Sequence, residues 1–287
     1  MSDAGAFQRV AVVGAGTMGN GIAQTFAAYG ASVQLVDVDE VGLKRGIATI
    51  EGSLARFVKK GTLPAAEAQA IVARIAPSKE LSSVREAELV VEAVVEKPEV
   101  KAAVFRQLDA QLPAHSILSS NTSSISITRI AANTKRADRV IGMHFMNPVP
   151  LMKLVEVVRG QETSSETCAR VVSCAESLEK VPVEASDYPG FVSNRVLMPM
   201  VNEAVFCLME GVSTREGIDT VMKLGMNHPM GPLALADLIG LDVCLDILEV
   251  LHEGLGDDKY RPCPLLRRYV AAGRLGKKSG KGFYEYA

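Results

Sequence analysis

The sequence predicts an α/β domain with a mainly parallel sheet, followed by an all-α domain. Strand-like and helix-like segments alternate from Arg9 to about Glu184, and helical periodicity alone follows them. Such alternation is typical of a mainly parallel sheet with helices on both faces. Because the pattern changes at residues 186–190, we expect a first domain over residues 1–186 and a second over residues 187–287.

Short apolar runs are the predicted strands of the first domain. They lie at residues 10–13, 33–36, 89–94, 116–119, 140–143 and 154–158. Most are rich in Val and Ile, which favour strands, and each has the length of a strand. Helical segments separate them, including residues 21–28 and a long helix over residues 39–60 that Gly61 is expected to end.

The second domain is predicted to be helical throughout. Helical periodicity covers residues 191–211, 214–224, 234–253 and 264–272, with Gly and Pro between these segments. The apolar content of this domain is high for its length. We therefore expect one large apolar face to be buried against the first domain or against a second subunit. A hinge is expected at residues 186–190, where the domains would close over a substrate.

Composition excludes several classes of protein. The formal net charge is -2 and basic residues are scattered along the chain, so no electrostatic surface for nucleic acid is expected. No apolar run approaches the ~18 residues of a membrane span. Residues 1–8 have neither the basic segment nor the apolar core of a secretory signal.

The cysteines indicate a reducing compartment. There are 5, an odd number, and no two of them have the CxxC spacing. This argues against a disulfide framework and against a zinc site. We therefore expect no metal, buried free thiols and a cytoplasmic location.

A Gly-rich run follows the first predicted strand and opens a helix, and it comprises Gly14, Ala15, Gly16, Thr17, Met18 and Gly19. In this context Gly14 allows a tight turn, and Gly16 allows the backbone to approach a pyrophosphate. Gly19 allows the helix to pack closely on the strand. The helix N-terminus supplies amides and the positive end of the helix dipole. The run predicts a dinucleotide site.

Asp37 indicates which dinucleotide binds. It ends the second predicted strand, where a carboxylate can accept hydrogen bonds from the adenine ribose and would repel a 2′-phosphate. This favours NAD over NADP. The neighbouring Lys44 and Arg45 are either solvated helix charges or soften that preference.

His144 is the candidate general base. The unperturbed pKa of histidine lies closest to neutrality, so its imidazole can take a hydroxyl proton. Glu156 follows in an apolar strand, where a carboxylate needs a partner, and it can orient the ring and stabilise the imidazolium. Beside a dinucleotide site, this pair predicts alcohol oxidation by hydride transfer. A histidine satisfied within the core is the alternative.

Several separated motifs together resemble the L-3-hydroxyacyl-CoA dehydrogenase family, in particular its short bacterial 3-hydroxybutyryl-CoA dehydrogenases. The matching stretches are residues 12–19, 120–124, 142–157, 190–195, 222–237 and 276–284. The resemblance covers nearly the whole chain. It implies a Rossmann-like first domain, a helical second domain that forms a homodimer interface, and reversible oxidation of a (3S)-3-hydroxyacyl-CoA by NAD.

The resemblance also implies the catalytic residues. It places the general base on His144, its carboxylate partner on Glu156, the active-site serine on Ser123 and a substrate-side asparagine on Asn194. Ser123 and Asn194 would hydrogen-bond substrate oxygens and orient C3. Satisfying loop amides is the alternative role for Ser123, and helix capping is the alternative for Asn194.

Ligand contacts are implied in the same way. Beyond the Gly-rich run, contacts with NAD fall on Asp37, Glu96, Lys101, Ser123, Asn147 and Lys278. Contacts with the substrate fall on Ser53, Lys60, Ser123 and Asn194, the first two with its CoA portion. A cation suits that polyanionic ligand, but Lys60 also ends a helix, where lysines are common because of the helix dipole.

Three other functions remain open from the sequence. The same architecture is similar to enzymes that act on 3-hydroxyadipyl-CoA and to L-gulonate dehydrogenases, because pocket shape sets the substrate. A protein that binds NAD without catalysis is the third alternative, since a fold alone does not determine function.

Overall fold

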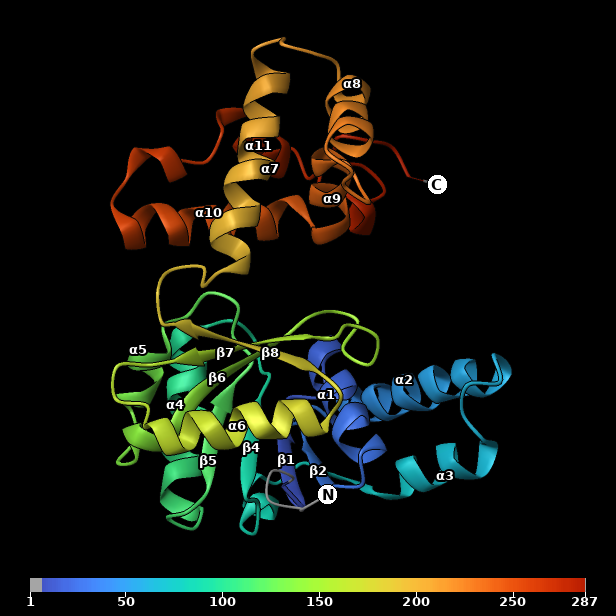
Figure 1. Ribbon diagram of the computed structural model, residues 1–287, viewed down its shortest axis with the longest axis vertical. Coiled ribbons are helices and arrows are strands. Elements are labelled where there is room, and N and C mark those ends of the chain that lie inside the picture. The colour runs from blue at the N-terminus through green and yellow to red at the C-terminus, as the bar shows by residue number, and fades with distance from the viewer. Residues whose placement is uncertain (1–6, 287) are drawn as a thin grey trace. The chain divides into compact units, whose positions relative to one another are not determined.

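The computed structural model describes residues 7–286, and the chain divides into two compact units between Asp187 and Tyr188 (Figure 1). The first unit contains a mostly parallel sheet covered by helices, and the second is helical. The fold class predicted from the sequence is confirmed.

The sheet of the first unit has eight strands within the described residues, in the order β3-β2-β1-β4-β5-β6-β7-β8. The strands are β1 (Arg9–Val13), β2 (Ser32–Val36), β3 (Ile75–Ser78), β4 (Leu89–Glu92), β5 (Ile117–Ser120), β6 (Val140–Phe145), β7 (Leu154–Arg159) and β8 (Val181–Ser186). Neighbouring strands are parallel except β6 and β7, which pair antiparallel. The order reverses between β1 and β4, the position at which open α/β sheets bind ligands beyond the carboxyl ends of their strands.

Strands β3 and β8 are not among the predicted strands. Both lie at edges of the sheet, and most of their residues are half-buried or exposed. An edge strand needs no continuous apolar run, and β3 contains Pro77, which a central strand does not tolerate. The central strand β4, by contrast, is buried at every position.

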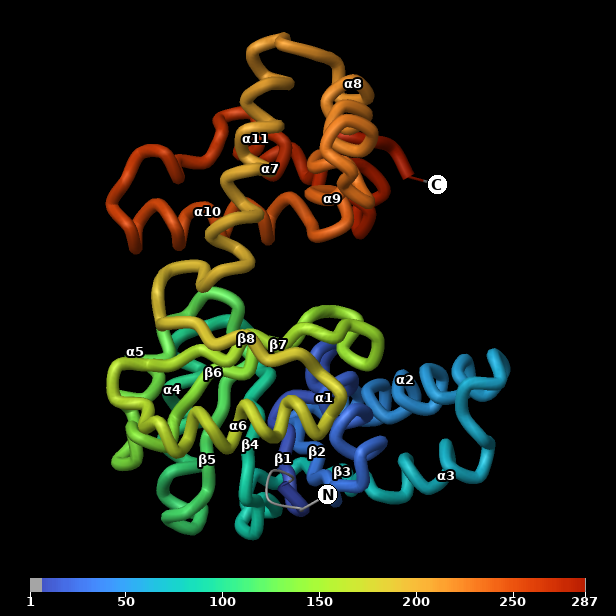
Figure 2. Tube along the Cα trace, viewed as in Figure 1, coloured from blue at the N-terminus to red at the C-terminus, as the bar shows by residue number. Residues whose placement is uncertain are grey.

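Helices cover the sheet of the first unit. They are α1 (Thr17–Ala28), α2 (Glu40–Lys59), α3 (Ala65–Ala73), α4 (Pro98–Gln111), α5 (Ile127–Ala131) and α6 (Ser165–Ser177). Helix α1 begins four residues before the predicted start at residue 21, because the Gly-rich run forms its first turn. Figure 2 shows α2 and α3 as an arm that extends from one side of the sheet.

The second unit contains α7 (Ser193–Met209), α8 (Arg215–Thr220), α9 (Pro232–Ile239), α10 (Leu241–Leu255) and α11 (Pro264–Ala271). Its core includes Met198, Leu233, Leu248 and Leu251. The single helix predicted over residues 234–253 is instead the pair α9 and α10. Gly240 separates them with a φ of 108°, a conformation that ends a helix and that glycine adopts most readily.

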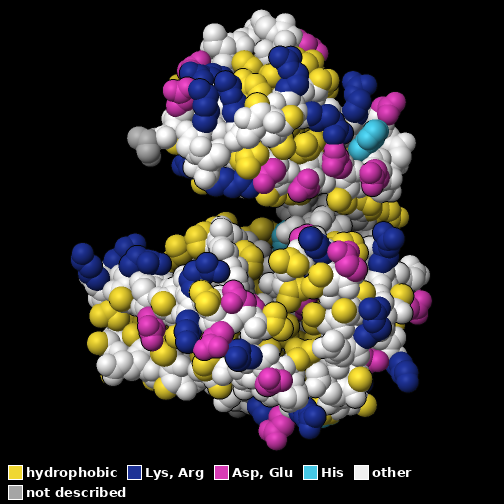
Figure 3. Space-filling model, turned by 180° about the vertical axis from the view of Figure 1, so that it is seen from behind, with side chains coloured by type: hydrophobic (Ala, Val, Ile, Leu, Met, Phe, Trp, Pro, Cys, Tyr) yellow, Lys and Arg dark blue, Asp and Glu magenta, His cyan; other side chains and the backbone are white. Residues whose placement is uncertain are grey.

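Short single turns complete the chain. They are the 3-10 turns Leu81–Val84, Ala137–Arg139, Asp258–Tyr260 and Lys277–Ser279, and the π turn Val221–Gly225. Basic and acidic side chains are interspersed over the face shown in Figure 3. Within residues 7–286, no helix is both long enough and apolar enough to cross a bilayer.

Candidate active site

His144 and Glu156 form a buried pair across two strands of the first unit. They lie directly opposite each other in the antiparallel pairing of β6 and β7. His144 Nδ1 lies 2.8 Å from Glu156 Oε2, and the two residues are 6% and 2% exposed. When Nδ1–H donates to the carboxylate, the lone pair of the neutral ring lies on Nε2. Nε2 is then the atom that can accept a proton.

A residue missed by the sequence analysis fixes the end of β6. Asn121 follows β5, and its Oδ1 accepts a hydrogen bond of 2.9 Å from the backbone N–H of Phe145. This contact ties the residue after His144 to the loop that follows the neighbouring strand. The available signal was the position of Asn121 within a polar run directly after a predicted strand.

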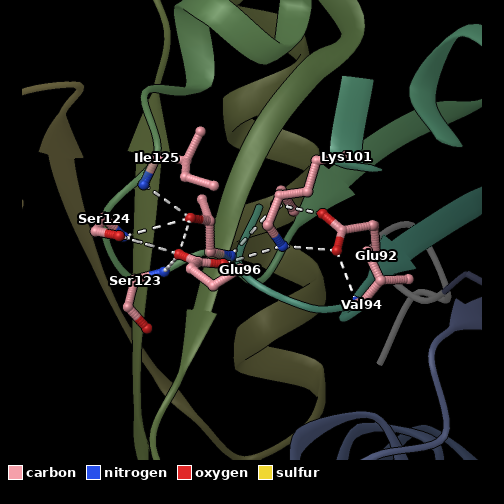
Figure 4. Close-up of polar contacts among 9 residues, drawn as sticks. Glu92, Val94, Glu96, Lys101, Ser123, Ser124 and Ile125 are labelled. Carbon is pink, nitrogen blue, oxygen red and sulfur yellow. Dashed lines mark hydrogen bonds and ion pairs between the residues drawn. The ribbon is translucent and has the colours of Figure 1, made fainter. Parts of the chain in front are cut away.

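The loop that carries Ser123 is organised by Glu96. Oε1 of Glu96 accepts hydrogen bonds from the backbone N–H groups of Ser123, at 2.9 Å, and Ser124, at 3.2 Å (Figure 4). It also accepts from the hydroxyls of Ser124 and Thr122. The sequence analysis assigned Ser123 and Glu96 separately, and the structure brings them into direct contact.

Lys101 joins the same cluster from α4. Its Nζ lies 3.1 Å from Glu96 Oε2 and 2.7 Å from Glu92 Oε1. Burial alone would raise the pKa of Glu96, but the charge of Lys101 and the hydrogen bonds from Thr122 and Ser123 outweigh burial and lower it. Glu96 is therefore an anion at neutral pH. Glu92 is a further residue that the sequence analysis missed.

The Gly-rich run forms a tight turn between β1 and α1. Gly14 has a φ of 104°, and a Cβ at Gly19 would lie 1.7 Å from the backbone oxygen of Gly14. No described atom lies within 4 Å of where a Cβ at Gly16 would be, so a ligand can approach this backbone closely. Oδ2 of Asp37 accepts a hydrogen bond of 2.8 Å from the N–H of Ala15. The turn and the carboxylate fit a dinucleotide.

Other predicted ligand residues line a cavity beside this turn. Its volume is about 300 Å³, and Gly16, Thr17, Ser53 and Asn147 are among the residues that line it. Two cations absent from the predicted contacts, Arg45 and Arg56 of α2, also line this cavity. Lys60, by contrast, is the C-cap of α2 and does not line it. The partly buried side chain of Met18 packs against the core of the first unit.

Two predicted site residues belong to the second unit. Asn194 lies in the first turn of α7 and is buried. It follows the first helical residue, so it does not occupy the capping position, which is Val192. Lys278 donates a hydrogen bond of 2.6 Å to Asp242 of α10. Among residues 7–286, no group of three or more His, Cys, Asp or Glu side chains is arranged to bind a metal.

Both units match models of one protein family. The model described as the 3-hydroxyacyl-CoA dehydrogenase NAD binding domain matches residues 9–188. The model of the C-terminal domain of 3-hydroxyacyl-CoA dehydrogenase matches residues 190–286. The chain belongs to the 3-hydroxyacyl-CoA dehydrogenase family.

Individual relatives are similar over nearly their whole length. A probable 3-hydroxybutyryl-CoA dehydrogenase of Bacillus subtilis is 57% identical over 97% of this chain and 97% of its own. The 3-hydroxybutyryl-CoA dehydrogenase of Bradyrhizobium diazoefficiens is 51% identical over 99% of this chain and 97% of its own. The crystal structure of (S)-3-hydroxybutyryl-CoA dehydrogenase from Ralstonia eutropha superposes with a TM-score of 0.96 at 48% identity, and covers 98% of this chain and 100% of that one.

This 3-hydroxyacyl-CoA dehydrogenase is an NAD-dependent oxidoreductase. The family and the cofactor predicted from the sequence are confirmed. The Gly-rich turn and Asp37 are the parts of the described chain that suit NAD by their chemistry.

Proposed function

We propose that the enzyme interconverts (3S)-3-hydroxybutyryl-CoA and acetoacetyl-CoA, with NAD as the hydride acceptor. The buried His144–Glu156 pair, 2.8 Å apart, is the single observation that carries the chemistry. The choice of a C4 substrate is supported by relatives of that name at 48% to 57% identity.

His144 acts as general base in the oxidation. Nε2 takes the proton of the 3-hydroxyl while C3 loses its hydride, and NAD supplies the acceptor for that hydride when it is bound. Glu156 Oε2 accepts from Nδ1–H throughout, and so stabilises the imidazolium that forms. Since the carboxylate is 2% exposed, water screens this attraction weakly. In the reverse direction, the imidazolium donates its proton to the ketone oxygen.

Ser123 and Asn194 are the proposed hydrogen-bonding partners of the substrate oxygens. The backbone N–H of Ser123 donates to Glu96, which fixes the position of this residue in its loop, and its hydroxyl is assigned to orient the substrate. Asn194 enters this assignment through its place in the family motif and through the burial of its amide side chain on α7.

Coenzyme binding is assigned mainly to the first domain, residues 1–186. The proposed contacts are Gly14, Gly16, Thr17, Met18, Gly19, Asp37, Glu96, Lys101, Ser123 and Asn147, with Lys278 from the second domain. Ser53 and Lys60 are assigned to the CoA portion of the substrate, and Ser53 has the stronger support because it lines the cavity beside the Gly-rich turn. Asp37 would repel a 2′-phosphate, so a strong preference for NAD over NADP is part of the proposal.

The second domain, residues 187–287, is assigned to substrate contact and homodimerisation. Several of its apolar side chains are exposed, including Val196 at 70%, Val212 at 70% and Leu224 at 81%. Exposed apolar side chains in such number favour a protein interface. All five cysteines of the described chain are free thiols, which supports a cytoplasmic location.

A substrate and coenzyme series tests the proposal. Purified enzyme is mixed with acetoacetyl-CoA, and the oxidation of NADH or NADPH is followed by absorbance in parallel reactions. Rapid oxidation of NADH with little oxidation of NADPH is expected. Higher turnover on 3-oxoadipyl-CoA or on L-gulonate would replace the proposed substrate. Tight binding of NADH without turnover on any of them would indicate a protein that only binds the coenzyme.

A further inference from the structure

Glu92 is a fully buried carboxylate at the carboxyl end of β4. It is 0% exposed, and the proposed function assigns it neither a ligand contact nor a catalytic step. Oε1 accepts hydrogen bonds of 2.7 Å from Lys101 Nζ and from the N–H of Val94, and Oε2 accepts one of 2.7 Å from Ser120 Oγ. Burying a charge in this way is costly unless the charge is paired, and Lys101 provides the pairing.

The pairing continues from Glu92 to the loop of Ser123. Figure 4 shows the ammonium of Lys101 between two carboxylates, with Glu92 on one side and Glu96 on the other. Lys101 is 1% exposed, and its single positive charge is shared by the buried carboxylate of Glu92 and by that of Glu96, whose side chain is 39% exposed. Glu96 is the outer carboxylate, and its other oxygen accepts from the amides of Ser123 and Ser124.

We propose that Glu92 is a positioning residue, which acts through Lys101 and Glu96 to fix the turn that carries Ser123. From the end of β4, the carboxylate of Glu92 holds the ammonium of Lys101, which reaches it from α4. The ammonium then determines where Oε2 of Glu96 lies, and this determines whether Oε1 can accept from the Ser123 and Ser124 amides. The chain of contacts joins the ends of β4 and β5 through α4.

The variant Glu92→Gln removes the charge and keeps the shape. Its amide oxygen can still accept from Lys101 and Val94, and the hydroxyl of Ser120 can rotate to accept from its amide nitrogen. Lys101 is then left with one carboxylate in place of two. Its ammonium is then drawn toward Glu96, and this change disturbs the contact of Glu96 with the Ser123 turn.

Amide hydrogen exchange of the enzyme without ligands tests the positioning directly. We expect exchange at Ser123 and Ser124 to be at least about tenfold faster in Glu92→Gln, because the hydrogen bonds from these amides to the carboxylate of Glu96 are weakened. The matched control is Glu88→Gln, just before the other end of the same strand, where Glu88 accepts from the backbone of Gln8 and Arg9. Exchange of the Ser123 turn is expected to be unchanged in the control.

A kinetic cycle tests the consequence for catalysis, and this part alone rests on the proposed function. Glu92→Gln is expected to lower kcat for acetoacetyl-CoA reduction by about tenfold to a hundredfold, with little change in the KM of the substrate, since orientation is lost and not binding. The double variant Glu92→Gln/Ser123→Ala should lose less in kcat than the product of the fold-losses of the two single variants. In the control double variant Glu88→Gln/Ser123→Ala, the fold-loss in kcat should equal the product of the fold-losses of the two single variants.

The outcomes are distinguishable. Unchanged exchange at Ser123 and Ser124 in Glu92→Gln would overturn the inference, as would losses in kcat that simply multiply. A wild-type enzyme without turnover, but with the expected exchange difference, would overturn the proposed function and leave the positioning role intact. If Glu92→Gln fails to fold, the variant Ser120→Ala takes its place, because it removes the hydroxyl that donates to Oε2 of Glu92. Unchanged exchange at Ser123 and Ser124 in that variant also overturns the inference.

Discussion

The chemistry proposed for this chain depends on charges that are buried and paired. The carboxylate of Glu156 contacts Nδ1 of His144 and is almost completely shielded from water. Its attraction for an imidazolium is therefore much stronger than the attraction within an exposed ion pair. The same reasoning applies to the ion pair of Lys101 with Glu92, whose side chains are 1% and 0% exposed. These groups lie at the carboxyl ends of central strands or next to them.

The lowered pKa of Glu96 predicts that the stability of the protein depends on pH. The pKa of Glu96 is lowered in the folded protein, so its stabilising contribution is complete above the ordinary value of 4.5 and is lost as the pH falls through the lower folded-state value. The free energy of unfolding should therefore differ between wild type and Glu96→Gln by a constant amount above that value, and the difference should shrink below it. Urea titrations across this pH range measure the difference. A gap that grows with acidification would contradict the assignment.

At the scale of elements, the central strands could be predicted from the sequence, but the edge strands and the helix break at Gly240 could not. The runs that become β1, β2, β4, β6 and β7 are apolar because both faces of the sheet are covered. Strands β3 and β8 lack that constraint, and the break at Gly240 depends on one backbone angle within a continuous apolar pattern.

The candidate site divides in the same way. The pairing of His144 with Glu156 could be predicted because their chemistry and their family motif coincide in a short stretch, and their catalytic roles stay a proposal. Glu92 and Asn121 could not, because their roles come from partners 28 and 24 residues away in the sequence. A single buried Glu in an apolar run resembles any strand residue until its partners are known.

The last residue of the first unit stabilises a distant helix. Asp187 accepts from the hydroxyl of Ser126 and from the N–H groups of Ile127 and Thr128, at 2.7 to 3.0 Å, so it caps α5 from about 60 residues away in the sequence. Asp187→Ala should lower the free energy of unfolding by about 1 to 3 kcal/mol. Urea unfolding measures this loss.

Asp138→Ala is the matched control for that prediction. The side chain of Asp138 is 59% exposed and lies 3.9 Å from Arg139, a surface pair that contributes little to stability. The control should change stability by less than about 0.5 kcal/mol. Equal effects of the two substitutions would show that the cap formed by Asp187 does not stabilise α5.

At the scale of the whole molecule, the proposed homodimer explains the exposed apolar side chains of the second unit. Sedimentation of the wild type should give twice the chain mass of 30.6 kDa. Leu224→Glu places a charge at a residue that is 81% exposed, and should shift the protein toward monomer if the π turn lies in the interface. The control Glu88→Gln should sediment as the wild type does. A wild-type monomer at every concentration would contradict the dimer.

The most direct test of the central claim is the single-turnover rate of NADH oxidation by acetoacetyl-CoA in His144→Gln and Glu156→Gln. Both variants should lose about 10² to 10⁴ in rate, because proton transfer to the ketone oxygen needs the imidazole and its carboxylate partner. NADH binding, measured by fluorescence titration, should change little. Rates equal to that of the wild type in His144→Gln would contradict the account.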